Sequence, residues 1–556
     1  MVLNCQNAPF LAEDSALMRN IKWMTILMAA LSFGVMPGKA ETDAAFAGLD
    51  GEVVARIHFA GSAQVSADPQ AAEINRFLGV PSAADFREQT LQKLSTAPYR
   101  LLKGKIAAQN TNDFAALIRP MLDDLVSGES YIEVRNSTNE IPELLLAVKV
   151  SNARAQLWQA YLSTILNSWT AMSVEPIRGD GYTGWQLKKH LEPNLIRFIH
   201  AGDWVLFGWG QDELHLQPPI LQRIKANQRP ADALTNIWLD ALVDLPAWNT
   251  HHPIKLPLPA NLPKLHLTVE GRKDFVRPKV TMLFDQPLGL KLEPWKIPTT
   301  YVRNPLASFT AIRGIGPWLG EIPEIKKLNP ASLPNQMTFW SIPQFPFGFC
   351  AVAPVPGASN YLAKLGPAIR AELNASPTNR PMTSPAVWTN GRVNFTMIFI
   401  SPYLTSMSEP TGDYLLGSLF PVLPKSNAPP LPRELMQEIS NKPNLVGYSW
   451  EINSERIMQW QALYQICYMA SLKSGPTPAS PGIKWLQAIR TNLANCGTEV
   501  TLTAPNELTL LRNAPLGLTG LELTGLEYWM DAPEFPLNSV YTRPSPAGLK
   551  LRPPKH

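Results

Sequence analysis

The sequence predicts an α+β protein in which repeated strand-helix-hairpin-helix modules form a mostly antiparallel sheet, with helices packed on one face. Three observations predict this class. Several stretches alternate apolar and polar residues, amphipathic helix patterns lie between them, and 53 of the 556 residues are proline. Proline removes a hydrogen bond from a strand ladder and is tolerated mainly at edges and in connections, so long runs of parallel sheet are disfavoured.

Length and composition narrow the classes of function. A chain of 556 residues exceeds one ordinary core, so several domains are expected. The net charge is only +4, and Lys and Arg do not cluster in the part expected to fold. Nucleic-acid binding needs grouped positive charge, so we expect no nucleic-acid partner.

Residues 18–40 have the layout of a bacterial signal peptide. Arg19 and Lys22 give a positive start, and an apolar stretch from Trp23 to Met36 follows. Small residues then lead to Ala40, so we expect cleavage after Ala40 and export to the periplasm or out of the cell. A membrane anchor is the alternative, but the run is short for about 30 Å of hydrocarbon.

The residues before this leader do not fit it. Residues 1–17 carry Glu13 and Asp14 where a positive start is expected, so we interpret them as a misannotated upstream start and Met18 as the true one. No later apolar run is long enough to cross a bilayer, so we expect no membrane span after signal cleavage.

The cysteines do not predict a disulfide framework. Cys5 lies in the upstream segment, which leaves Cys350, Cys467 and Cys496. Their spacing is not that of metal ligands. In an oxidising compartment Cys467 and Cys496 could form one disulfide bridge. The alternative is that all three cysteines are small buried thiols.

Similar helix patterns recur along the chain. NARAQLWQAYL begins at Asn152 and SERIMQWQALY at Ser454, and a third pattern begins at Ser359-Asn360. Each follows a strand pattern and precedes a hairpin pattern, with Asp203, Asp413 and Glu507 at corresponding turns. We interpret these as modules at about 143–226, 335–441 and 444–530.

The predicted organisation follows from these modules. The mature chain consists of an N-terminal α+β domain at 41–230 containing the first module, a β-rich middle segment at 231–334, the second module within 335–443, the third at 444–530 and a Pro-rich basic tail at 531–556. In the middle segment TNIWLDALVDL alternates, with Leu239, Ala241 and Val243 on one face, and KLHLTVEG and VRPKVTMLF predict a hairpin.

Three runs, EQTLQKLSTAPYRLL (88–102), SFTAIRGIGPWL (308–319) and NCGTEVTLTAPNELTLLR (495–512), resemble segments of large secreted bacterial proteins of unknown function. The resemblance covers most of the mature chain. It implies export and modularity, and it implies no activity and no catalytic residues.

Familiar catalytic motifs are missing from the sequence. It has no G-x-S-x-G, no H-E-x-x-H, no P-loop and no G-x-G-x-x-G after a strand. We therefore predict no catalytic, cofactor-binding or metal-binding residues and no cofactor.

Two groups of residues remain as candidates for a ligand site. The first is a polar cluster near the first hairpin, which would form if the hairpin and the following loop curl together. The alternative is that these residues are ordinary solvated turn residues. They are His200, Asp203, Asp212, Glu213 and His215. The second is the loop RGIGPWLGE, where Arg313 and Trp318 face a sugar or an acid, or where Trp318 fills a gap between domains.

These observations favour an exported non-catalytic protein that binds or scaffolds an unknown protein or envelope component. The alternative is a secreted hydrolase of polysaccharide or peptide that uses a carboxylate pair, because such a pair needs no sequence motif. A continuous apolar or aromatic patch without such acids would favour binding, and a deep pocket holding two carboxylates with strongly perturbed pKa values would favour the enzyme.

Overall fold

The computed structural model describes residues 46, 49, 52–101, 111–136, 142–170, 172–188, 195–211, 213–251, 261–343, 348–374, 386–389, 391–394, 401–420, 429–470, 480–533 and 535–536. Both helices and a large antiparallel sheet are present, which confirms the α+β class. The predicted signal peptide and the C-terminal part of the predicted tail lie outside these residues.

Two runs of ten strands make up the sheet. The first run consists of β1 (Val53–Phe59), β2 (Ser130–Arg135), β3 (Glu143–Lys149), β4 (Glu175–Gly179), β5 (Tyr182–Lys188), β6 (Leu195–Ala201), β7 (Trp204–Gly210), β8 (Leu239–Asp244), β9 (Lys264–Gly271) and β10 (Val276–Leu283). The second consists of β11 (Ser308–Arg313), β12 (Gln336–Ile342), β13 (Gly348–Pro354), β14 (Val387–Thr389), β15 (Arg392–Asn394), β16 (Tyr403–Glu409), β17 (Gly412–Ser418), β18 (Leu445–Glu451), β19 (Cys496–Ala504) and β20 (Glu507–Asn513).

Helices interrupt both runs. They are α3 (Ser62–Ala67), the 3₁₀ turn η2 (Pro69–Ala71), α4 (Ala72–Leu78), α5 (Pro81–Leu101), α6 (Thr111–Ser127), α7 (Asn152–Thr170), α8 (Gln217–Lys225), α9 (Leu245–His251), α10 (Gly316–Glu321), α11 (Pro323–Leu328), α12 (Ala358–Asn374), α13 (Arg433–Ser440), α14 (Asn453–Ala470), α15 (Pro481–Arg490) and α16 (Gly520–Asp531). No described helix is long and apolar enough to span a membrane.

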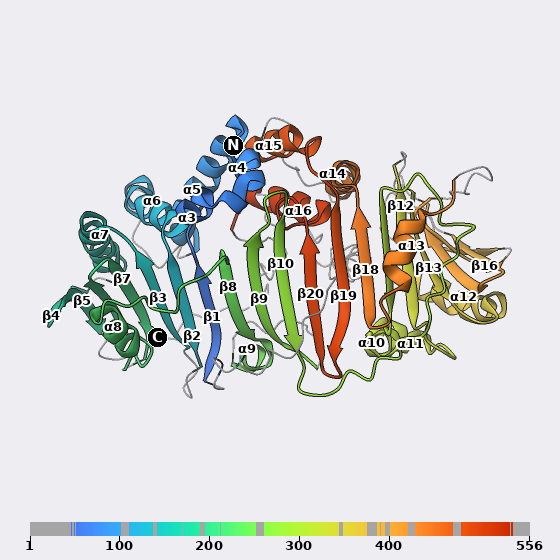
Figure 1. Cartoon of the computed structure of the whole chain (residues 1–556), viewed down its shortest axis with the longest axis horizontal. Helices are drawn as coiled ribbons and strands as arrows, with labels where there is room; N and C mark the ends of the chain where they lie inside the picture. Colours follow the sequence, from blue (N-terminus) through green and yellow to red (C-terminus); the bar gives the residue numbers. More distant parts are fainter. Residues whose placement is uncertain are drawn as a thin grey trace, which may run out of the picture.

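Every pairing between these strands is antiparallel, and together they form one continuous sheet (Figure 1). Its order is β4-β5-β6-β7-β3-β2-β1-β8-β9-β10-β20-β19-β18-β11-β12-β13-β17-β16-β15-β14. The order of β1 to β10 from the centre outward is the order of β11 to β20. The chain therefore consists of two halves with one strand order, here called the first and the second half.

The halves meet at the middle of the sheet, where β10 pairs with β20. Lys279 lies opposite Leu511, and Thr281 lies opposite Thr509. Because these strands correspond to each other in the two halves, the halves are related by an approximate two-fold axis through this pair.

The repeat differs from the predicted modules in its extent. The ranges 143–226 and 335–441 have the same pairing, since β3 pairs with β7 and β13 with β17 around an intervening helix and two hairpins. The range 444–530 has another pairing, because β18 pairs directly with β19. Its counterpart in the first half is β8 to β10.

Helices lie on both faces of the sheet, so the predicted single covered face is wrong. Helix α7 packs against Val148 and Phe198, whereas α8 packs against Leu145 and Ile199. Neighbouring residues of a strand point to opposite faces, so these two helices lie on opposite sides. The prediction failed because these strands are apolar on both faces.

A cluster of helices at one end of the strands connects the two halves (Figure 1). Trp485 of α15 stacks on Phe86 of α5 with ring centroids 5.5 Å apart, and its indole donates a hydrogen bond to the carbonyl of Phe77. Ile457 of α14 and Leu523 of α16 pack into the same cluster. The first-half helices α4 and α5 are therefore joined to the second-half helices.

Candidate binding surface

One face of the central strands in the first half is uncharged at its described positions. Strand pairing places Ile57 between Ile132 and Ala241, and Val243 opposite Leu265. We call this surface the open face and define it by Ile57, Ile132, Val134, Leu144, Leu239, Val243, Leu265 and Leu267.

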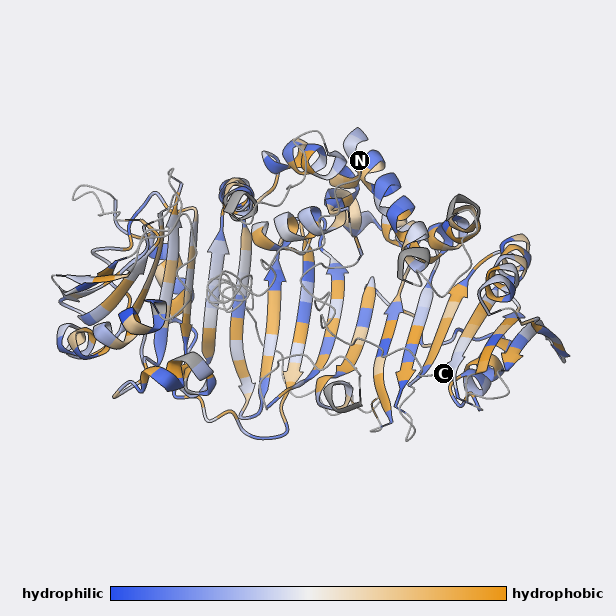
Figure 2. Ribbon diagram, turned by 180° about the vertical axis from the view of Figure 1, so that it is seen from behind, coloured by the Kyte–Doolittle hydropathy of each residue, from blue (hydrophilic) through white to orange (hydrophobic). Residues whose placement is uncertain are grey.

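Burial separates the open face from the opposite face of the same strands. Leu145 and Ala147 of β3 have no exposed surface. Leu144 of the same strand, which points to the open face, is only half-buried. The side chains of the open face are all half-buried and belong to none of the hydrophobic clusters formed by the described residues. Figure 2 shows the alternation along the central strands as bands of orange and blue.

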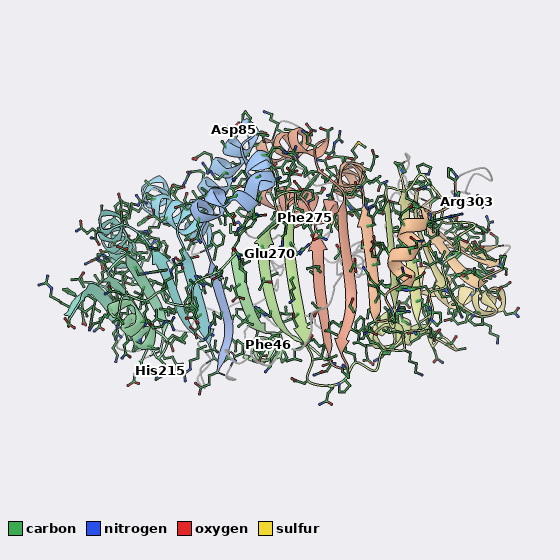
Figure 3. The ribbon with its side chains drawn as sticks, in the orientation of Figure 1. Phe46, Asp85, His215, Glu270, Phe275 and Arg303 are labelled. Carbon is green, nitrogen blue, oxygen red and sulfur yellow. The ribbon has the colours of Figure 1, made fainter. Side chains whose placement is uncertain are left out.

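The opposite face of these strands carries the charges. Glu133 accepts hydrogen bonds from Arg56 at 3.2 Å and from the Tyr131 hydroxyl at 2.5 Å. His266 lies 2.8 Å from Asp240 and packs edge-on against Phe46, which Figure 3 places near the lower ends of the central strands. The charged side chains of these strands thus lie on one side only, beside the buried Leu145, Ala147 and Leu242.

The two halves can be aligned residue by residue through their hydrogen bonds. The amide of Val150 donates to the carbonyl of Asp203, and that of Val355 donates to Asp413, both at 2.9 Å. Following the strand pairs inward from these bonds matches four open-face residues to polar ones in the second half. The matches are Ile57 with Thr310, Val134 with Ser341, Val243 with Glu451, and Leu267 with Thr498.

Two of these polar positions, Ser341 and Glu451, lie beside a buried arginine. The Arg456 guanidinium lies 3.1 Å from Ser341 Oγ and 3.5 Å from Glu451 Oε2. It also lies over the neighbouring rings of Phe349 and Trp460, at 5.0 and 4.6 Å from their centroids. Burial lowers the pKa of Arg456, and the Glu451 carboxylate opposes this shift.

Two helices cover this part of the second half. Arg456 and Trp460 come from α14, and the amide of Gly520 at the start of α16 donates to Glu451 Oε1 at 2.6 Å. α16 begins with a capping box between Thr519 and Glu522. The buried charges are therefore paired and hydrogen-bonded, as buried charges must be.

The first half lacks both covering helices among its described elements. The counterpart of α14 is α9, which has only seven residues. The β8–β9 connection spans 245–263, whereas the β18–β19 connection spans 452–495 and holds both α14 and α15. The counterpart of α16 would follow β10, but there the chain crosses the second half, where Phe284 and Leu288 pack on Val446 and Leu508.

A pair of acids lies apart from the open face, inside the helix cluster. Glu527 and Asp531 are one turn apart on α16 and are 0% and 8% exposed. Burial, together with the neighbouring Asp531, raises the pKa of Glu527 to about 9. Asp531 accepts a hydrogen bond from Gln89 at 2.7 Å, and a Cβ at Gly482 would lie 2.6 Å from its Oδ2. The pair is packed between helices and leaves no room for a substrate at this point.

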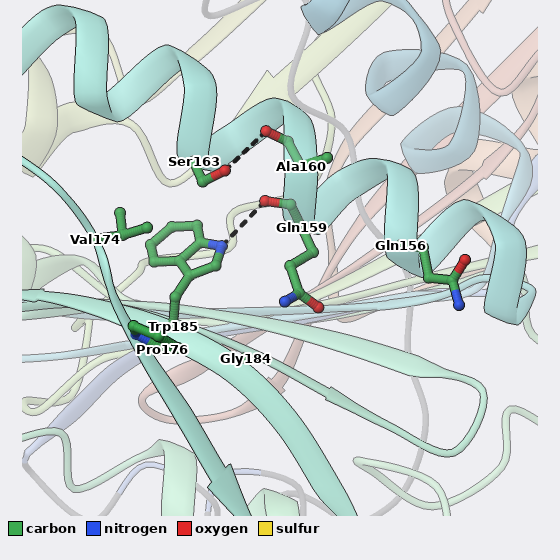
Figure 4. A pocket seen from close by; sticks show the side chains of 8 residues that line it. All are labelled: Gln156, Gln159, Ala160, Ser163, Val174, Pro176, Gly184 and Trp185. Atoms are coloured by element: carbon green, nitrogen blue, oxygen red, sulfur yellow. Dashed lines mark hydrogen bonds between the residues drawn. The ribbon is translucent and has the colours of Figure 1, made fainter.

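A shallow hollow of about 400 Å³ lies between α7 and the β4–β5 hairpin (Figure 4). Its polar side chains are Gln156, Gln159 and Ser163, all uncharged. The Trp185 indole, only 2% exposed, donates to the carbonyl of Gln159 at 3.1 Å. The hollow offers no titratable group among its lining residues and no free aromatic face.

The first predicted site does not assemble. His200 Nε2 lies 3.0 Å from the carbonyl of Gly202, beside the exposed Asp203 at the start of β7. Glu213 and His215 are exposed beyond the other end of this strand, and His215 lies at the lower edge of the molecule in Figure 3. A seven-residue strand separates the ends by roughly 20 Å, so the two parts do not meet. Asp212 lies outside the described residues.

The two residues of the second predicted site differ in burial, because Arg313 is buried and Trp318 is exposed. Arg313 is 4% exposed and donates to the backbone carbonyls of Leu445, Glu293 and Pro443 at 2.6–2.8 Å. Its guanidinium also lies 4.5 Å from the Trp295 ring, and burial lowers its pKa. Trp318 is 42% exposed on α10. Arg313 is a structural residue that fixes a loop, whereas Trp318 keeps a large part of its surface accessible.

The residues of the open face were visible to sequence reasoning only as strand patterns. The alternation of Leu239, Ala241 and Val243 predicts one apolar face, and KLHLTVEG predicts another. No pattern in one strand says whether a helix elsewhere in the chain covers that face. Among the described residues, no group of three His, Cys, Asp or Glu side chains is placed to hold a metal.

Comparison with known proteins adds no family to this description. No protein-family model, no curated protein and no solved structure matches the chain.

Proposed function

We propose that the protein is an exported, non-catalytic binding protein that holds an apolar partner, an envelope component or a protein, on the open face. The observation that carries this proposal is the one-sided polarity of β1, β2, β3, β8 and β9. Adjacent apolar side chains that keep part of their surface accessible on one face of a sheet favour an interaction site. The repetition of one strand order supports a surface role, because repetition builds surface more readily than a single active site.

The contrast between the halves supports the same proposal. In the second half two of the equivalent positions, Ser341 and Glu451, are polar, buried and hydrogen-bonded to α14 or α16. In the first half they are apolar and half-buried. A difference of this kind, at matched positions in one sheet, favours a specialised surface in the first half.

A dye that fluoresces on apolar surfaces, such as anilinonaphthalene sulfonate, tests the open face directly. Leu267→Lys places a charge on it, and Thr268→Lys is a matched control on the opposite face of the same strand. We expect the native protein to bind the dye at neutral pH and Leu267→Lys to lose most of the signal. Equal signals from both variants and the native protein would contradict the proposal.

Export is tested separately by expressing the chain from Met18 in a bacterial host and fractionating the cells. The proposal expects periplasmic or secreted protein whose N-terminal sequence begins at Glu41. Cytoplasmic protein that retains residues 18–40 would contradict it.

The alternative function is a hydrolase of polysaccharide or peptide that uses Glu527 and Asp531. The raised pKa of Glu527 is the observation that favours it, since general acids are tuned in this way. The close packing of Gly482 and Phe86 around Asp531 argues against it. Hydrolysis of a glycan or peptide panel that disappears in Glu527→Gln would establish the enzyme.

A further inference from the structure

In the second half a helix of the chain itself covers this face of the sheet. There α14, a helix of 18 residues, lies across the positions equivalent to the open face. Its residues Arg456 and Trp460 point to the sheet and contact Ser341 and Phe349. The counterpart helix α9 of the first half comprises seven described residues, Leu245–His251.

We propose that the open face binds an amphipathic helix supplied by a partner protein, in the place that α14 occupies in the second half. This inference rests on the proposed function and names the class of its partner. The register of the two halves supports it, because the sheet positions beneath α14 and the open face correspond strand by strand.

The chemistry of the surface specifies the helix. Where Arg456 meets Glu451, the open face offers Val243, and where Gln459 and Arg456 approach Ser341, it offers Val134. A buried charge would have no partner at either place and would be costly. The contacting side of the helix must therefore be apolar throughout, with large side chains at i, i+3, i+4 and i+7.

The helices around the open face determine which elements a bound helix would lie next to. α14 packs on α15 and α16 beside α5, and α5 belongs to the first half. α6 and α7 stand on the other side of the open face, packed on Val148 and Phe198. A helix on the open face would lie between these elements, with its polar side away from the sheet.

The test uses the full chain and a fluorescein-labelled amphipathic peptide of the length of α14, with Leu and Ile on one helical face. A peptide of the same composition with scrambled order is the control. We expect saturable one-to-one binding of the first peptide, and binding weaker by about tenfold or more for the scrambled one. Leu267→Lys should lose binding by about tenfold or more, and Thr268→Lys should keep it.

A second measurement does not depend on a variant that folds. A benzophenone placed on the apolar side of the peptide should cross-link the native protein within β1, β2, β8 or β9. Cross-links confined to other elements, or no binding up to about 100 µM peptide, would overturn the inference.

Two further arms separate this inference from the proposed function. If an acyl-chain probe in mixed micelles binds and Leu267→Lys abolishes it, while the peptide does not bind, the face takes lipid and the helix inference fails alone. If the protein dimerises and Leu267→Lys makes it monomeric, the occupant is a second copy, and the inference again fails. If no probe binds and the protein is monomeric, both proposals fail.

Discussion

Val243 and Glu451 occupy the same position in the two halves of the sheet. Val243 pairs with Ala55 and Leu265, whereas Glu451 pairs with Ser308 and Cys496. One backbone position thus holds an apolar side chain in a half-buried surface and a buried carboxylate beneath two helices. The type of side chain at this position thus differs with the presence of covering helices.

Removing the arginine beside Glu451 should destabilise the second half. Arg456→Met leaves the Glu451 carboxylate buried with only the Gly520 amide bonded to it. We expect a loss of about 3–5 kcal/mol of unfolding free energy, and a smaller loss in Arg456→Met with Glu451→Gln. Urea denaturation measures both. Met458→Ala, an exposed change on the same helix, is the control, and an unchanged midpoint in Arg456→Met would contradict the assignment.

Glu527 should make stability depend on pH. Its pKa, about 9 when folded, lies above the value of 4.5 for an ordinary glutamate. Above about pH 4.5 Glu527 is ionised in the unfolded chain but still protonated in the folded protein. The free energy of unfolding therefore falls as pH rises towards 9, by at most about 1.4 kcal/mol per pH unit. Glu527→Gln should stabilise the protein increasingly from pH 5 to 9, as thermal unfolding at several pH values would measure. Glu321→Gln, at an exposed acid, should not do so.

Arg313 and Trp318 should behave in opposite ways although they are close in the sequence. Arg313→Met leaves the carbonyls of Leu445, Glu293 and Pro443 without their donor, so we expect a loss of about 2–4 kcal/mol. Trp318→Ala removes an exposed side chain and should change the unfolding free energy by less than about 0.5 kcal/mol. Chemical denaturation compares them, and equal effects would contradict the structural role of Arg313.

The thiols of Cys350 and Cys496 are free and buried, and burial raises their pKa to about 11 and about 12. Cys467, the other member of the predicted bridge to Cys496, has a side chain outside the described part of the structure. We expect neither thiol to react with Ellman's reagent in the folded protein at pH 8, and both to react in denaturant. Mass spectrometry of tryptic peptides identifies the labelled residues, and rapid labelling of Cys496 before unfolding would be the contrary result.

Local elements were predictable because each depends on nearby residues. The helix predicted from Asn152 is α7, and the Trp residues of the two matching helix patterns, Trp158 and Trp460, are 4% and 2% exposed. The strand predicted from Thr235 begins only at Leu239, since Asn236 has a φ of 59°, which a strand does not allow.

The strand order was not predictable, because it depends on pairs distant in the sequence. β1 pairs with β8, and β10 pairs with β20, and neither contact leaves a local signature. The shared Trp-Gln-Ala consequently suggested an equivalence that the sheet does not have. Trp158 lies on α7, whose counterpart is α12, whereas Trp460 lies on α14, whose counterpart is α9. The candidate surface was hidden for the same reason.

The pairing of β10 with β20 has a consequence for how the two halves can change. Backbone hydrogen bonds join the two strands, and Val280 and Met282 pack with Leu508 and Leu510 in one cluster across them. Trp485 and Phe86 join the halves again in the helix cluster. Residues away from these contacts, such as those of the open face, can change in one half without a matching change in the other. A single polypeptide of this kind can keep its central contacts while one half acquires a new surface.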